Sequence, residues 1–224
     1  MVGRVRGVQA PGDRASGATG GQYFSTEPAS APARRTITLT LPDVTIDLLT
    51  DRGVFSGDRV DPGTKLLLST VPAIEPAGAR VLDLGCGYGP IAVVAGLRVP
   101  DAEVWAVDVN ARARELCTDN AAASGCANVR VAAPGDVPAD LRFDVIWSNP
   151  PIRIGKPALH ELLRRWLTRL TPDTGRAWLV VQKHLGSDSL MAWLQAEGWP
   201  TTRLTSRQAY RILEVSARGE PDLD

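Results

Sequence analysis

The stretch RVLDLGCGYGP (residues 80–90) decides the fold, because it joins a strand to a helix through a turn rich in glycine. Val81, Leu82 and Leu84 carry the branched apolar side chains typical of a strand buried on both faces. Gly85, Gly87 and Gly89 follow, and the apolar run 89–98 predicts a helix directly after them. A turn of this kind lets backbone N–H groups approach a ligand closely.

The spacing of these glycines restricts the kind of ligand. The pattern is GxGxG followed by Pro90, which differs from the GxGxxG of dinucleotide-binding proteins. No Lys-Ser or Lys-Thr pair follows, so the turn is not a triphosphate-binding loop. Asp108 ends the next predicted strand, where a carboxylate can accept hydrogen bonds from both hydroxyls of a ribose. The two features together predict an adenosine-type ligand without a pyrophosphate.

From residue 80 onward, predicted strands and helices alternate, which indicates a mostly parallel sheet with helices on both faces. The expected strands are 80–85, 103–109, 128–133, 142–148 and 175–183, and the expected helices are 89–98, 111–125, 157–170 and 187–198. Residues 201–218 predict two antiparallel strands that close the sheet. We therefore expect an α/β, Rossmann-like sheet of seven strands, mostly parallel with an antiparallel last strand.

The segment before this alternating pattern has a different organisation. Residues 35–50 alternate around Pro42-Asp43 and predict an N-terminal β-hairpin, and residues 64–72 predict a short helix. Residues 1–33 are rich in Gly, Ala, Pro, Ser and Arg without an apolar period, so we expect a disordered tail there. This divides the chain into the tail and one domain over 34–224, in which 34–72 form the hairpin and helix and 73–224 the core.

Composition limits the possible partners and compartments. The 224 residues are 44% hydrophobic, and 25 basic residues balance 25 acidic ones, so any contact with nucleic acid must come from a local patch. The three cysteines show no CxxC spacing, which argues against a disulfide framework or a zinc site. With no long apolar run and no secretory signal, we expect a cytoplasmic protein without a membrane partner or a metal.

The stretch WSNPPIRIGK (residues 147–156) carries the second chemical feature. Two prolines end the preceding strand, since neither can continue it, and they fix the local backbone. The amide oxygen of Asn149 and the carbonyl oxygen of Pro150 can each accept one N–H of an amino or amide nitrogen. Such a pair orients the nitrogen lone pair and stabilises the positive charge that develops when the nitrogen is alkylated. This chemistry needs no general base.

The glycine turn and Asp108 together resemble the corresponding motifs of class I S-adenosylmethionine-dependent methyltransferases. In that family the turn packs on the methionine part of S-adenosyl-L-methionine, and the acidic residue after the second strand binds the ribose. Asp136, in PGDVP, matches the acidic position that contacts the adenine amino group. The resemblance implies that the cofactor is bound by Asp83, Gly85, Cys86, Gly87, Gly89, Asp108, Val109, Asp136, Asn149 and Phe55. Of these, Phe55 belongs to a segment described below.

Residues 149–152, the NPPI segment, resemble the NPP-(Tyr/Phe/Trp) motif of methyltransferases that act on adenine N6, guanine N2 or a glutamine amide. The resemblance implies that Asn149, Pro150, Pro151 and Ile152 form the catalytic segment. In many members the fourth residue is an aromatic ring that stacks on the flat acceptor. Ile152 departs from that pattern, so this position offers an apolar surface and no ring.

The segment GVFSGDRVDPGTKLLLSTVP (residues 53–72) narrows the resemblance to one branch. It is similar to a block in the catalytic domain of ribosomal RNA guanine-N2 methyltransferases, in the small-domain methyltransferase group. The matching residues are Val54, Phe55, Ser56, Val60, Asp61 and Gly63. The resemblance runs from about Arg35 to the C-terminus. It implies that Phe55 and Asp61 line the cofactor cleft and that the substrate is guanine N2 in ribosomal RNA.

A ribosomal RNA or ribosomal subunit as partner requires cations near the NPPI segment. Arg153 and Lys156 adjoin it, and Lys183 ends the fifth predicted strand, so we expect these three to contact phosphate. Three alternatives stay open. They are methylation of a protein glutamine, methylation of a small molecule on nitrogen, and a catalytically silent module that only binds the cofactor.

Overall fold

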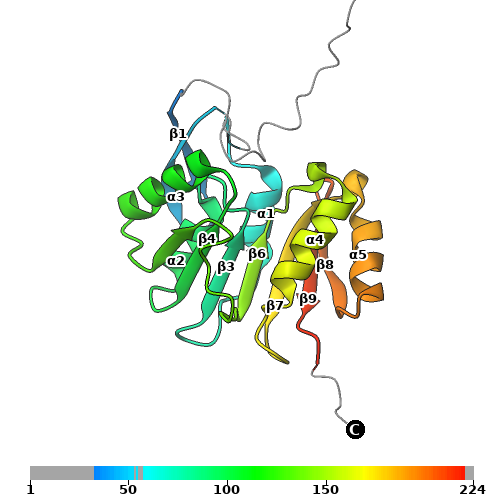
Figure 1. The fold of residues 1–224 in the computed structure, drawn as a ribbon. Coiled ribbons are helices and arrows are strands. Elements are labelled where there is room, and N and C mark those ends of the chain that lie inside the picture. The colour runs from blue at the N-terminus through cyan, green and yellow to red at the C-terminus, as the bar shows by residue number, and fades with distance from the viewer. Residues whose placement is uncertain (1–32, 53, 55–57, 220–224) are drawn as a thin grey trace, which may run out of the picture.

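The computed structural model describes residues 33–52, 54 and 58–219, which form a central sheet with helices on both faces (Figure 1). The strands are β1 Arg35–Thr40, β2 Thr45–Thr50, β3 Arg80–Leu84, β4 Glu103–Val107, β5 Val129–Ala132, β6 Val145–Ser148, β7 Arg176–Gln182, β8 Thr201–Arg207 and β9 Tyr210–Ser216. The helices are α1 Pro62–Thr70, α2 Pro90–Arg98, α3 Ala111–Ala123, α4 Lys156–Leu167 and α5 Ser187–Ala196. Two short 3-10 turns are η1 Ile152–Ile154 and η2 Lys183–Leu185.

The strand order of the large sheet confirms the expected fold. In the described residues the order is β5-β4-β3-β6-β7-β9-β8, and neighbouring strands from β5 to β7 run parallel. Strand β9 runs antiparallel to both β7 and β8 and is the antiparallel last strand of the prediction. Strand order reverses between β3 and β6, and that switch point is where ligands bind in open α/β sheets.

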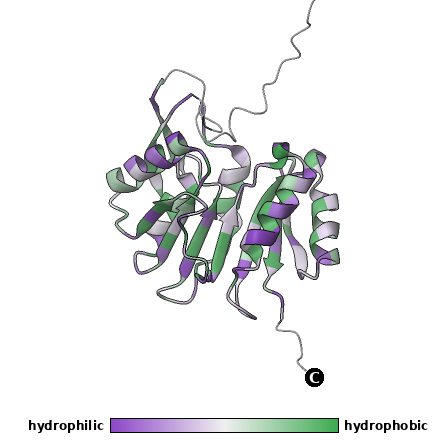
Figure 2. Cartoon of the chain, viewed as in Figure 1, coloured by the Kyte–Doolittle hydropathy of each residue, from purple (hydrophilic) through white to green (hydrophobic). Residues whose placement is uncertain are grey.

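The two faces of the sheet are covered by different helices. Neighbouring side chains of a strand point to opposite faces, so Val81 packs with α1, α2 and α3 while Leu82 packs with α4 and α5. Figure 2 shows the strands largely in the hydrophobic colour, as a sheet buried on both faces requires. None of the helices in the described part is long and apolar enough to cross a membrane.

The predicted N-terminal hairpin is confirmed as an antiparallel pair of β1 and β2, with Leu39 opposite Ile46. A buried side chain fastens it to the core, because the Asn120 amide of α3 bonds the backbone of the hairpin. The N–H of Leu49 donates to Asn120 Oδ1 at 2.7 Å, and Asn120 Nδ2 donates to the carbonyls of Leu49 and Tyr88 at 2.8 and 2.7 Å. The hairpin is therefore fixed beside the glycine turn, in which Tyr88 lies.

The other predicted strands and helices are all present, with ends displaced by a few residues. The fourth strand is the most shortened, because it begins at Val145 and not at residue 142. The two 3-10 turns were not predicted, and both follow strands at the edge where β3, β4, β6 and β7 end, called here the carboxyl edge. Residues 1–32 of the predicted tail lie outside the described residues, and the division into tail and domain stays a prediction.

Replacing Gly89 by alanine is expected to lower the free energy of unfolding by about 2–4 kcal/mol. Gly89 has a φ of +90°, and a Cβ at this position would lie 2.6 Å from Cys117 Sγ and 3.2 Å from Cys117 Cα. Urea unfolding measures the change. Gly135→Ala is the matched control, since no heavy atom lies within 4 Å of its added Cβ. Equal midpoints for the two variants would show that the contact between α2 and α3 is not tight.

Candidate functional site

A cavity of about 340 Å³ opens at the carboxyl edge, between the glycine turn, the NPPI segment, the start of α1 and the end of β7. Most of the predicted site residues line it, namely Gly85, Cys86, Gly87, Asp108, Val109, Asn149, Pro150, Pro151 and Ile152. Three predicted residues do not, and these are Asp83, Gly89 and Asp136. Phe55 lies outside the described residues, although its neighbour Val54 is buried and lines the cavity.

The glycine turn is shaped by backbone bonds to the end of β4. The N–H groups of Gly85 and Cys86 both donate to the carbonyl oxygen of Val107, at 2.8 and 3.0 Å. Gly85 and Gly87 have φ angles of +77° and +56°, which an L side chain rarely adopts. The sequence therefore needs glycine here so that the turn can fold back over β4 and face the cavity with bare backbone.

Asp108 is held at the end of β4 by two backbone donors. Its Oδ2 accepts from the N–H of Gly87 at 2.9 Å, and its Oδ1 accepts from the N–H of Asn110 at 2.8 Å. Burial raises the pKa of Asp108, and these two N–H bonds oppose the rise. Each oxygen keeps a lone pair, so the carboxylate can still accept two hydroxyls. Val109 beside it is 43% exposed and adds an apolar surface to this end of the cavity.

Asp83 and Gly89 lie at the two ends of the segment that holds the glycine turn, and neither lines the cavity. Asp83 is buried, its Oδ2 accepts from the N–H of Ala92 in the first turn of α2 at 3.0 Å, and its Oδ1 has no partner among the described residues. Burial therefore raises the pKa of Asp83 well above its usual value, although the Ala92 N–H opposes this. The structure thus places these two residues outside the cavity lining, and the cofactor contacts implied for them stay predictions.

Asp136 lies in the turn after β5 and is exposed. Its backbone N–H donates to the carbonyl of Ala133 at 3.0 Å, and the neighbouring Pro134 lines the cavity in its place. The predicted contact of Asp136 with an adenine amino group also stays a prediction.

The NPPI segment is stiff for a reason beyond its two prolines. The N–H of Ile152 donates to the carbonyl oxygen of Pro150 at 2.8 Å, and Pro151 has a φ of −73° and a ψ of 72°. These values define an inverse γ-turn. The turn fixes the direction of the Pro150 carbonyl at the cavity wall and leaves that oxygen one lone pair for a ligand.

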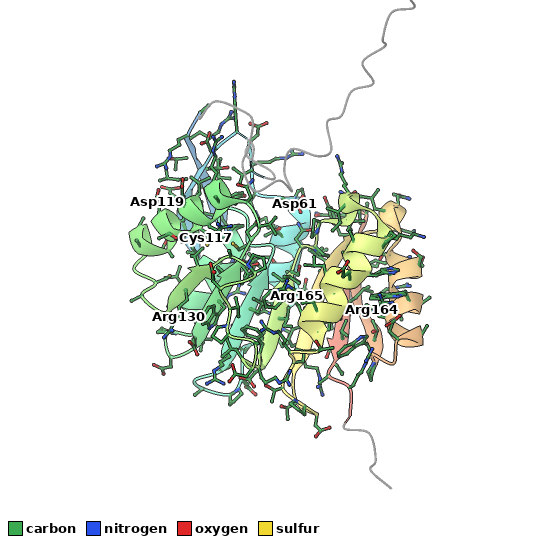
Figure 3. The ribbon with its side chains drawn as sticks, in the orientation of Figure 1. Asp61, Cys117, Asp119, Arg130, Arg164 and Arg165 are labelled. Carbon is green, nitrogen blue, oxygen red and sulfur yellow. The ribbon has the colours of Figure 1, made fainter. Side chains whose placement is uncertain are left out.

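The amide of Asn149 has its orientation set by the start of α1. Its Nδ2 donates to Asp61 Oδ1 at 2.9 Å and lies 3.0 Å from Thr64 Oγ1. An ionised carboxylate only accepts hydrogen bonds, so the amide nitrogen must face Asp61 and the amide oxygen must face away. No described residue donates to that oxygen. Figure 3 shows Asp61 at the start of α1, beside the end of the sheet.

Asp61 Oδ1 has a second function, because it also accepts from the N–H of Thr64 at 3.0 Å and caps α1. The sequence placed Asp61 in the cleft but gave no sign that it holds Asn149, and it did not single out Thr64. A sequence signal for the cap was available, since Asp followed by Pro at the first helical position is a typical helix start.

The charges of the cavity fit a cofactor that is cationic and lacks phosphate. Among the described lining residues, the charged side chains are Asp61, Asp108 and Arg153, and Asp108 is the one at the glycine turn. The Asp108 carboxylate with its free lone pairs, the exposed backbone of the glycine turn and the apolar Val109 side chain together suit an adenosine that carries a sulfonium. This fold and this site define an S-adenosylmethionine-dependent methyltransferase.

Comparison with known proteins gives the family. The model of the methyltransferase small domain matches residues 45–214, and the chain belongs to that family. The chain is 31% identical over 196 residues to the uncharacterized protein YbxB of Bacillus subtilis, covering 86% of this chain and 96% of that protein. It is also 33% identical over 150 residues to ribosomal RNA small subunit methyltransferase C of Shewanella amazonensis, covering 66% of this chain but only 43% of that protein.

Solved structures agree on the fold. The 16S rRNA N2 methyltransferase RsmC of T. thermophilus, solved with AdoMet and guanosine, superposes with a TM-score of 0.70 and 23% identity. The match covers 85% of this chain and 52% of that one. TrmN from Thermus thermophilus gives a TM-score of 0.55 and 27% identity over 69% of this chain. This chain thus spans about half the length of each of these two proteins.

Asp61→Ala is expected to free the Asn149 amide and to remove the cap of α1, at a cost of about 1 kcal/mol in unfolding free energy. Asp61→Asn is the matched control, since its amide oxygen can accept both bonds that the carboxylate oxygen accepts. Hydrogen exchange of the Asn149 side-chain NH₂, followed by NMR, should accelerate in the alanine variant alone. Equal exchange in all three proteins would show that Asp61 does not hold the amide.

Proposed function

We propose that this protein methylates the exocyclic N2 amino group of a guanine in ribosomal RNA, with S-adenosylmethionine as methyl donor. One observation carries the proposal. The Asn149 amide oxygen accepts no hydrogen bond from the described residues, and the Pro150 carbonyl oxygen accepts one. Both residues line the same cavity, and Asp61 and the γ-turn fix the directions of the two oxygens. The same cavity reaches the glycine turn and Asp108, where the cofactor would be held.

The chemistry follows from what these two oxygens can do. The lone pair of an aromatic amino nitrogen is delocalised into its ring, so the nitrogen is a weak nucleophile. Two acceptors that bind both N–H groups orient the nitrogen so that its lone pair points at the methyl group. They also stabilise the positive charge that grows on the nitrogen. The bound cofactor supplies an electrophilic methyl group on its sulfonium. The extra proton then leaves to solvent, so the site needs no general base.

The choice of ribosomal RNA is supported by relatives and by charge. Several relatives about 30–33% identical are named ribosomal RNA small subunit methyltransferase C, and the RsmC structure was solved with guanosine. Arg153, Lys156 and Lys183 are exposed beside the cavity, and no described residue forms an ion pair with any of them. Phosphates of an RNA can provide that partner. A ribosomal substrate would also place the reaction in the cytoplasm.

The three arginines Arg164, Arg165 and Arg169, on α4 and just after it, differ from Arg153, Lys156 and Lys183 because they have partners within the protein. Arg164 pairs with Glu197, Arg165 donates to the carbonyl of Pro134, and Arg169 donates to the carbonyl of Pro138. These bonds hold α4 and its end on the core, so the guanidinium groups are less available to RNA.

The proposal is tested by incubating the protein with tritiated methyl donor and, separately, ribosomal RNA, ribosomal subunits and release factor. We expect label on the RNA, recovered as N2-methylguanosine after digestion. Asn149→Ala should lower kcat about 100-fold while the Kd for S-adenosylmethionine stays unchanged, because Asn149 acts on the acceptor nitrogen. Label on protein alone, or full turnover in Asn149→Ala, contradicts the proposal.

A double variant, Arg153→Gln with Lys156→Gln, is expected to raise the apparent KM for RNA about tenfold and to weaken its dependence on salt. The control removes two charges at the opposite edge of the sheet, as Arg80→Gln with Arg130→Gln, both of which pair with Glu103 in the native protein. Steady-state rates at several salt concentrations measure both effects. The same change in KM for the two doubles would mean that total charge, and not this surface, attracts RNA.

A further inference from the structure

A second polar wall of the cavity comes from two residues that the sequence did not single out. Gln182 ends β7 and Tyr210 begins β9, and the two are directly opposite each other in the antiparallel pair. Both line the cavity together with Asn149 and Pro150. Gln182 Nε2 donates to the hydroxyl of Tyr210 at 3.1 Å, which fixes the two side chains relative to each other.

The start of α1 supports this wall as well as the Asn149 amide. A Cβ on Gly63 would lie 2.6 Å from Tyr210 Cε1 and 2.8 Å from Asp61 Oδ1, so only glycine leaves room for both neighbours. Tyr210 therefore packs against the same turn of helix that orients Asn149. The two hydrogen-bonding walls therefore contact the same turn of α1.

Tyr210 also provides an aromatic ring that the NPPI segment lacks. The other described aromatic side chains on the lining, Tyr88 and Trp166, are 3% and 0% exposed, whereas Tyr210 is only partly buried. Ile152 offers an apolar surface from the NPPI segment. A flat acceptor in this cavity can thus meet an aliphatic surface from one wall and a ring with a polar edge from another.

The hydrogen-bonding groups left free by the pair form a definite pattern. Because Gln182 Nε2 already donates to Tyr210, Gln182 Oε1 remains an acceptor and the Tyr210 hydroxyl hydrogen remains a donor. Asn149 Oδ1 and the Pro150 carbonyl add two more acceptors. The Watson–Crick edge of guanine has the complementary set, since its N2 carries two N–H donors, its N1 carries a third, and its O6 accepts.

We propose that Gln182 and Tyr210 determine specificity for guanine, with Gln182 Oε1 accepting from N1–H and the Tyr210 hydroxyl donating to O6. This inference rests on the proposed function, because it assigns the acceptor base of the same site. A half-turn of the Gln182 amide would present the opposite pattern, which suits the N1 of adenine. Comparison of guanine with adenine therefore tests the orientation that the pair adopts.

The test measures binding of free nucleosides by NMR titration of the protein saturated with S-adenosylhomocysteine. We expect guanosine to bind at least about fivefold tighter than adenosine or 1-methylguanosine, whose N1 offers no N–H. Tyr210→Phe and Gln182→Leu should each raise the Kd for guanosine about 3–10-fold and leave that for S-adenosylhomocysteine unchanged. Phenylalanine keeps the ring that packs on Gly63, so the variant retains its fold.

Gln195→Leu is the matched control, because the amide of this exposed α5 glutamine likewise donates one hydrogen bond, here to the carbonyl of Thr201, but lies outside the cavity lining. It should bind guanosine as the native protein does. Equal Kd values for guanosine and adenosine, or native affinity in both test variants, would overturn the inference. The proposed function is contradicted by a different result, the absence of label on RNA. The nucleoside titration tests the role of Gln182 and Tyr210 whichever result the labelling gives.

Discussion

One carboxylate oxygen, Asp61 Oδ1, connects the three parts on which the site depends. It accepts from the N–H of Thr64 and so begins α1, and it accepts from the Asn149 amide and so orients the acceptor end of the cavity. It also lies close enough to Gly63 that no side chain fits there, which lets Tyr210 pack on the same turn. Because a carboxylate cannot donate, this single contact excludes the wrong orientation of Asn149. The start of α1 and the orientation of the Asn149 amide are therefore one structural unit.

The charged side chains differ between the two ends of the cavity. The end at the glycine turn presents Asp108, whose two oxygens each accept one backbone N–H. The outer side presents Arg153, Lys156 and Lys183, to which no described residue is paired. Most other arginines are engaged with carboxylates or backbone carbonyls. A chain with equal numbers of basic and acidic residues can thus keep a local positive surface, because pairing elsewhere removes the competing cations.

Local sequence patterns predicted the strands and helices well. They predicted less well the position of residues whose role depends on partners far away in the sequence. Each strand and helix was anticipated from apolar periodicity, because that signal is contained within a few consecutive residues. Asp83 and Gly89 belong to the glycine motif by sequence, yet neither lines the cavity, since Asp83 bonds α2 and Gly89 makes room for Cys117. Spacing along the chain shows which residues share a turn, but it does not show which of them face the cavity.

The sequence by itself determined the parallel core, the glycine turn with Asp108 and the stiff NPPI segment, since each depends on residues that are consecutive or follow a regular alternation. The tertiary structure alone decided the direction of the Asn149 amide, which depends on a residue 88 positions away along the chain. It also decided the pairing of Gln182 with Tyr210, which exists only because β9 runs antiparallel beside β7. The physical reason is the same in both cases: hydrogen bonds between side chains need a geometry that folding sets and that no local pattern records.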